Sequence, residues 1–131
     1  MPLAVASVIR RHLRATEAFT AAHGDARPPR AVPVGDEPLV GWYVNPPPDD
    51  SEWVLFTERA IYVVAGANVR RIPLDEIVAY ELPESKTAAT DVVIDTRSGR
   101  DRIPMRGRHG PNGRFTDAWS LVQVLHVLVR K

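Results

Sequence analysis

The chain contains no cysteine among its 131 residues. This absence excludes disulfide bonds, thiolate metal sites and a cysteine nucleophile. Long hydrophobic runs are also missing, because no apolar stretch approaches the roughly 20 residues that span a bilayer. The first residues lack the apolar segment that follows the basic start of a signal peptide. We therefore expect a soluble, cytoplasmic protein of one ordinary domain.

Catalytic and metal-binding motifs are scarce as well. No serine lies in a G-x-S-x-G elbow, and none of the four histidines belongs to an H-x-x-x-H or H-E-x-x-H pattern. The acids Asp49 and Asp50 are adjacent, and adjacent carboxylates in an extended chain rarely share a proton. His109 draws interest only because it lies in a basic, glycine-rich loop. We expect no enzyme activity, no cofactor and no metal site.

Net charge is small, at +1, and gives no strong global attraction to nucleic acid or to an anionic membrane. Its distribution is uneven, however. Residues 1–35 carry +3, residues 36–96 carry −8 and residues 97–114 carry +5. This separation favours local electrostatic steering of a charged partner.

The amino-terminal part reads as a helix followed by a connector. Val5, Ile9 and Leu13 recur every four residues, and Phe19 can extend the stripe, so residues 2–22 are predicted to be helical and to stop near Gly24. Prolines between residues 25 and 38 favour a stiff, extended connector. We expect segments 1–24 (helix), 25–38 (connector) and 39–131 (main domain). The thin stripe predicts an appendage, whose deletion leaves the sheet folded.

Short β-rich runs follow from residue 39 onward. Seven strands are predicted, at residues 39–45, 53–57, 60–65, 69–72, 76–82, 91–96 and 100–105. Their regular spacing favours a sandwich or a barrel. Trp42 and Tyr43 must lie on opposite faces of a strand, which leaves one of the two rings free to be exposed as a partner contact.

A second helix is predicted for residues 116–130. Thr116 or Asp117 can cap its first turn. The apolar side chains at helical spacing are predicted to pack on the sheet: Ala118, Leu121, Val122, Leu125 and Val129. Its β-branched valines make a strand the competing interpretation, but fifteen residues without a turn signal favour the helix.

Three motifs carry a resemblance to a known family: WVLFTERAIY at residues 53–62, RRIPLDEI at 70–77 and DVVIDTRSG at 91–99. With the closing helix, they resemble the bacterial pleckstrin-homology-like (PH-like) domain. The resemblance implies an α+β fold, in which a bent seven-stranded antiparallel sheet or barrel is capped by the C-terminal helix, with an extra N-terminal helix here. Its members bind phosphoinositides, peptides or proteins and are seldom enzymes. The acids in residues 46–52 would repel a phosphorylated head group at close range.

An arginine cluster is the candidate partner-binding or anion-binding site. It consists of Arg97, Arg100, Arg102, Arg106, Arg108 and Arg114. Either the acidic middle of the chain or an acidic partner supplies its counter-charge. We expect a non-enzymatic protein-interaction module of a bacterial protein, such as an immunity-type or adaptor protein. It would bind another protein or itself as a homo-oligomer. The alternative is an anion-binding domain for membrane lipid head groups or nucleic acid.

Overall fold

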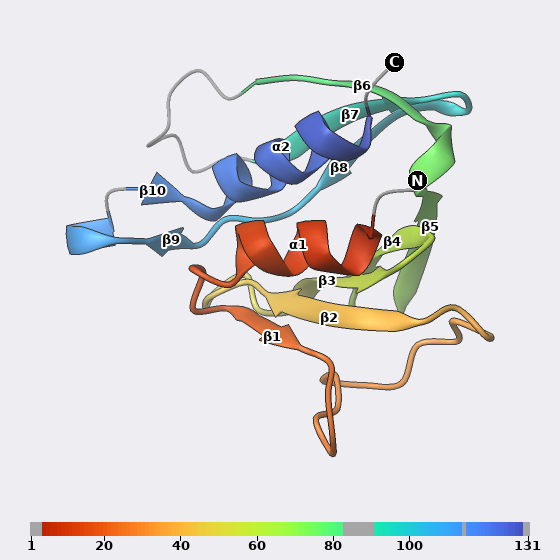
Figure 1. The fold of residues 1–131 in the computed structure, drawn as a ribbon. Coiled ribbons are helices and arrows are strands. Elements are labelled where there is room, and N and C mark those ends of the chain that lie inside the picture. The colour runs from red at the N-terminus through yellow and green to blue at the C-terminus, as the bar shows by residue number, and fades with distance from the viewer. Residues whose placement is uncertain (1–3, 83–90, 114, 130–131) are drawn as a thin grey trace.

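A computed structural model describes residues 4–82, 91–113 and 115–129 of the chain. Two helices and a set of antiparallel strands make it an α+β protein (Figure 1). The helices are α1 (Val5–Leu13) and α2 (Asp117–Leu128). The strands are β1 (Phe19–Ala21), β2 (Leu39–Val44), β3 (Glu52–Thr57), β4 (Ala60–Ala65), β5 (Asn68–Pro73), β6 (Ile77–Tyr80), β7 (Val92–Thr96), β8 (Gly99–Ile103), β9 (Arg108–His109) and β10 (Phe115–Thr116). Short 3-10 turns lie at Leu74–Glu76 (η1) and Pro111–Gly113 (η2).

The seven strands predicted from the sequence correspond to β2 through β8. They do not form one bent sheet or a closed barrel, however. Strands β1 to β5 form one sheet in chain order, β6 to β8 form a second, and β9 pairs with β10. The break follows Pro73, where η1 separates β5 from β6. The Leu74 N–H still donates to the Arg59 carbonyl oxygen (2.9 Å), and η1 then leads the chain into the second sheet.

The predicted helix over residues 2–22 is wrong in its second half. Helix α1 ends at Leu13, whose carbonyl oxygen accepts hydrogen bonds from both the backbone N–H and the hydroxyl of Thr16 (3.0 and 2.7 Å). Phe19 then lies in β1, opposite Tyr43 of β2. Gly41 allows this pairing, because a Cβ there would lie 2.5 Å from the Thr20 carbonyl oxygen. Pairing with a distant strand therefore overrides the helical pattern.

Helix α2 forms as predicted over its described residues, and Thr116 is its N-cap. The Thr116 side chain makes no capping hydrogen bond. The Asp117 carboxylate accepts a hydrogen bond from the Tyr43 hydroxyl instead of capping the helix. Four of the five side chains expected to be buried are buried: Ala118, Leu121, Val122 and Leu125. Val129, just beyond the helix, is half-buried.

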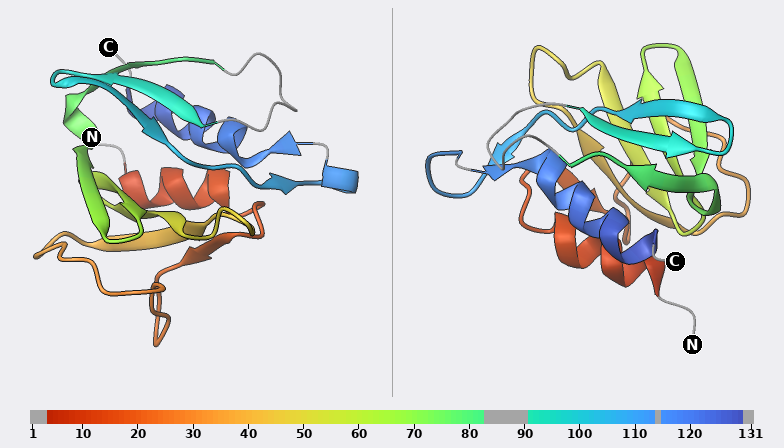
Figure 2. Two further views of the ribbon diagram at one scale, coloured as in Figure 1. Left: turned by 180° about the vertical axis from the view of Figure 1, so that it is seen from behind. Right: turned by 90° about the horizontal axis from the view of Figure 1, so that it is seen from above.

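The main core lies between the two helices and the inner faces of the sheets. Figures 1 and 2 show α1 beside α2, with α1 lying between α2 and β2. Ile9 and Leu13 of α1 are fully buried in the same cluster as Leu121 and Leu125 of α2. Helix α1 thus contributes directly to the core that the strands of residues 39–131 share.

The connector covers the outer face of the five-stranded sheet. Trp42, Trp53 and Tyr62 form a second buried cluster on that face, and Val32 and Val34 of the connector pack against it. The interpretation that one ring of the Trp42–Tyr43 pair is free to be exposed is therefore wrong. Both rings are buried, Trp42 under the connector and Tyr43 in the main core.

Glu37 fastens the end of the connector to the sheet. Its carboxylate accepts hydrogen bonds from Thr57 Oγ1 (2.7 Å), Tyr62 Oη (2.9 Å) and Arg71 Nε (3.0 Å). Burial disfavours the charged carboxylate, but these three hydrogen bonds outweigh burial and hold the pKa of Glu37 below its ordinary value.

Replacing Glu37 with glutamine is expected to lower the free energy of unfolding by about 1–2 kcal/mol near neutral pH. Because the folded pKa is depressed, the stabilisation is complete above the ordinary value of 4.5 and is lost as pH falls through the folded value. Urea denaturation of both proteins at several pH values should show the difference shrinking in acid. The matched control is Asp36→Asn, whose side chain is 95% exposed and should change stability little. An equal loss of stability in both variants would show that the hydrogen bonds of Glu37 do not stabilise the fold.

Candidate partner-binding surfaces

The five described members of the predicted arginine cluster are spread along the chain from the β7–β8 turn to β9. Arg97 lies in the turn between β7 and β8, Arg100 and Arg102 lie on β8, and Arg108 lies on β9. Arg106 follows β8, and Arg114 lies outside the described residues. Because β8 is extended, Arg97 before the strand and Arg106 after it are separated by the length of the strand.

Two members of the cluster are engaged by carboxylates of the same chain. Arg106 donates to both oxygens of Asp91 (2.7 and 3.1 Å), contacts Glu52 and pairs with Asp49 at 3.2 Å. Hydrogen bonding to Asp91 raises the pKa of Arg106 above its ordinary value. Arg100 pairs with Glu81 (2.8 Å) and Asp95 (3.2 Å). These two arginines therefore meet the acidic middle of the chain.

The remaining described members of the cluster keep more of their charge available. Arg97, Arg102 and Arg108 form no ion pair with any described residue, although Arg108 donates to the Gly113 carbonyl oxygen at 3.4 Å. Sequence reasoning also missed Arg70, which pairs with Asp101 (2.8 Å) and donates to the Arg102 carbonyl oxygen (3.1 Å). Arg70 thus links β5, the last strand of the five-stranded sheet, to β8, a contact that no local pattern indicates.

A buried polar network forms where α2 begins. The Asp117 side chain is almost fully buried, and its carboxylate accepts hydrogen bonds from Tyr43 Oη and from His109 Nδ1, the latter at 2.7 Å. Tyr43 Oη in turn accepts from the Gly107 N–H at 2.8 Å. Burial, followed by the hydrogen bond to Asp117, raises the pKa of Tyr43 far above its ordinary value. Tyr43 therefore stays protonated and donates to Asp117.

Gly107 is required for this network to close. A Cβ at position 107 would overlap both the Asp117 carboxylate and the Tyr43 hydroxyl. The backbone at position 107 lies so close to the hydrogen bond between Tyr43 and Asp117 that only glycine fits there.

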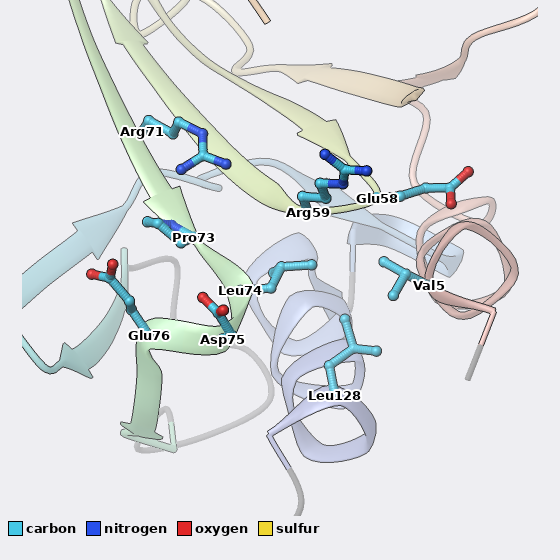
Figure 3. A pocket seen from close by; sticks show the side chains of 9 residues that line it. All are labelled: Val5, Glu58, Arg59, Arg71, Pro73, Leu74, Asp75, Glu76 and Leu128. Carbon is cyan, nitrogen blue, oxygen red and sulfur yellow. The ribbon is translucent and has the colours of Figure 1, made fainter. Parts of the chain in front are cut away.

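An open groove lies between η1, the β3–β4 turn and the ends of the two helices. Figure 3 shows Val5, Leu74 and Leu128 on its floor, with charged residues on its rim. The charged lining consists of Arg59 and Arg71, with Glu58 beside Arg59, and of Asp75 and Glu76 at η1. The volume of this part of the groove is about 610 Å³.

A second hollow continues the groove toward β6, and shares Leu74, Asp75 and Leu128 with the first. It adds Ile77, Val78 and Val129 as apolar lining, with Arg97 at its margin. We call the two hollows together the η1–α2 groove. Val78 is 41% exposed, and Leu82, a short distance further along the chain, is 66% exposed. The groove is thus apolar at its centre and charged at its edges.

Comparisons with known proteins give no relative on which to base a function: no protein family, curated protein or solved structure matches the chain. Within the described residues, no helix is both long and apolar enough to cross a bilayer. Nor do those residues bring together three or more acidic or histidine side chains in an arrangement suited to a metal ion. The surfaces described above are therefore the basis for any functional argument.

Proposed function

We propose that this chain is a non-enzymatic protein-interaction module that binds another protein through the η1–α2 groove. The observation that carries the proposal is the composition of the groove, with an apolar floor at Val5, Leu74 and Leu128 and a rim of charged residues. Protein interfaces have this anatomy, in which a desolvated apolar centre is surrounded by a polar margin. An immunity-type or adaptor role in a bacterium fits such a module.

The order of the strands supports a PH-like fold for the module. Four consecutive antiparallel strands, β2 to β5, are followed by three more, β6 to β8, and then by α2, which packs into the core. Seven antiparallel strands closed by a helix are what the sequence resemblance implies, but here the strands divide between two sheets, α1 and β1 precede them, and β9 and β10 stand before α2. In that family binding is the common activity, so the arrangement favours an interaction module by analogy of fold.

The occupant we propose is an extended segment of a second protein with an apolar anchor side chain. Among the described strands, β6 pairs only with β7, so its other edge is free beside the apolar lining. A free edge offers backbone hydrogen bonds to an extended partner, and the adjoining pocket selects a side chain. Charged residues of both signs on the rim would orient a partner of complementary charge.

Binding of a polyanion through the predicted arginine cluster is the weaker alternative. Arg100 and Arg106 are paired with carboxylates, which reduces the charge available to lipid head groups or nucleic acid. Of the six arginines, Arg97 lines the groove and therefore belongs to the site that we propose. A binding constant that falls steeply with salt, on anionic vesicles or RNA, would favour the alternative.

Replacing Val78 with glutamate should abolish capture of the partner. The wild-type chain and the variant are each used as bait in the native host, and bound proteins are quantified by mass spectrometry. Val69→Glu is the matched control, because Val69 is also an exposed valine (37%) but does not line the groove. We expect at least about a tenfold loss of one protein with Val78→Glu, since a charge is placed at the centre of the interface.

Two outcomes would overturn the proposal. In the first, Val78→Glu and Val69→Glu capture the same proteins in the same amounts as the wild-type chain. In the second, sedimentation of the purified wild-type chain shows self-association that Val78→Glu removes, which would make a second copy the occupant of the groove. Circular dichroism of each variant establishes that the fold is retained.

A further inference from the structure

A cationic pocket lies on a different part of the molecule from the η1–α2 groove. It is formed by the second half of α1, by β9 and β10, and by the first turns of α2, and has a volume of about 420 Å³. Its polar lining consists of Arg11, His12, Arg14, His109, Ser120 and Gln123. Among the described residues that line it, none is an aspartate or a glutamate. We call it the α1–β9 pocket.

The arginines of this pocket have no counter-charge within the described part of the chain. Neither Arg11 nor Arg14 forms an ion pair there, and both also line an adjoining hollow with Arg10. Like charges three and four residues apart on a helix repel one another. The negative end of the α1 dipole stabilises cations near Leu13, but this effect does not explain why His109 from β9 faces the same pocket.

His109 is held rigidly in the wall of the pocket. Its Nδ1 lies 2.7 Å from Asp117 Oδ1, and Asp117 is itself fixed by Tyr43. Because an ionised carboxylate only accepts hydrogen bonds, Nδ1 carries the proton. Nε2, on the other side of the ring, has no hydrogen-bond partner among the described residues. Nε2 is thus a ring nitrogen held in a fixed position in a pocket that Arg11 and Arg14 also line.

We propose that the α1–β9 pocket binds a phosphoryl group, either as inorganic phosphate or on a phosphorylated side chain of a polypeptide. Guanidinium groups match phosphate oxygens with paired N–H donors, and an anion between Arg11 and Arg14 removes their mutual repulsion. Ser120 and Gln123 supply uncharged donors, and the His109 ring lines the same pocket. The site is independent of the groove, because no residue lines both.

The test is to titrate the full chain with inorganic phosphate and, separately, with a phosphoserine peptide. Binding is monitored by isotope-edited NMR. We expect saturable shifts at Arg11, Arg14, His109 and Ser120, and at least about a tenfold weaker affinity in the double variant Arg11→Gln/Arg14→Gln. The matched control is Arg27→Gln/Arg30→Gln, which removes the same charge from exposed positions outside the pocket. The control should bind within about twofold of the wild-type chain at fixed salt.

The two probes distinguish the source of the group. Tighter binding of the peptide indicates a phosphorylated polypeptide, and equal binding indicates the free anion. The proposal is overturned if neither probe saturates at low salt, or if the two double variants lose affinity equally, which would be attraction to net charge alone. Partner capture by the groove variant Val78→Glu is measured separately, so either proposal can fail without the other.

Discussion

Deletion of residues 1–24 is expected to abolish the cooperative unfolding transition. The deletion removes Ile9 and Leu13, which are fully buried against α2, and β1, which pairs with β2. Loss of two buried aliphatic side chains alone costs about 4–10 kcal/mol, comparable to the whole net stability of a small domain. Circular dichroism and urea denaturation of the truncated chain measure the effect. This outcome is the opposite of the one predicted from the thin apolar stripe.

A point substitution makes the same test where the truncated chain does not accumulate. Leu13→Ala should lower the free energy of unfolding by about 2–5 kcal/mol, while Ser7→Ala, at an exposed position of the same helix, should change it little. A truncated chain that unfolds cooperatively with nearly unchanged stability would make α1 an appendage after all.

Replacement of Asp117 by alanine should cost about 2–4 kcal/mol of folding stability. Asp117 is 1% exposed, and its removal leaves the Tyr43 hydroxyl and His109 Nδ1 without their acceptor inside the protein. Each buried donor left unpaired costs about 1–3 kcal/mol. The measurement is urea denaturation of the variant beside Asp95→Ala, which breaks only an exposed ion pair with Arg100 and should cost under about 1 kcal/mol.

Tyr43→Phe removes the hydrogen bond to Asp117 without removing a charge, so it separates the effect of the hydrogen bond from that of the lost carboxylate. The double variant Tyr43→Phe/Asp117→Ala should be less destabilised than the sum of the two single variants, because both remove the same hydrogen bond. Additive losses would show that Tyr43 and Asp117 stabilise the fold separately.

Local patterns were sufficient for most of the secondary structure. The strands β2 to β8 and helix α2 follow from alternation and helical spacing, which neighbouring residues express directly. Strand β1 does not, because its formation depends on the absence of a side chain at Gly41. The connector reads as a stiff linker, and only the folded chain places Val32 and Val34 over the buried tryptophans.

The candidate sites were harder to predict than the strands. Closeness in sequence grouped the arginines from Arg97 to Arg114, but an extended strand separates them, and carboxylates distant in sequence neutralise Arg100 and Arg106. The groove depends on bringing Val5, Leu74 and Leu128 together from three parts of the chain. The basic helical residues Arg11 and Arg14 are visible in the sequence, but their approach to His109 requires the packing of α1 on α2.

The central claim is that a second protein occupies the η1–α2 groove, and site-specific photo-crosslinking tests it most directly. A photoreactive amino acid is placed at position 78 or at position 69, and each chain is irradiated in the native host. We expect one adduct of defined mass from position 78, containing the protein that the wild-type chain captures, and none from position 69. Equal crosslinking at both positions, or none at position 78 while that protein remains bound, would contradict it.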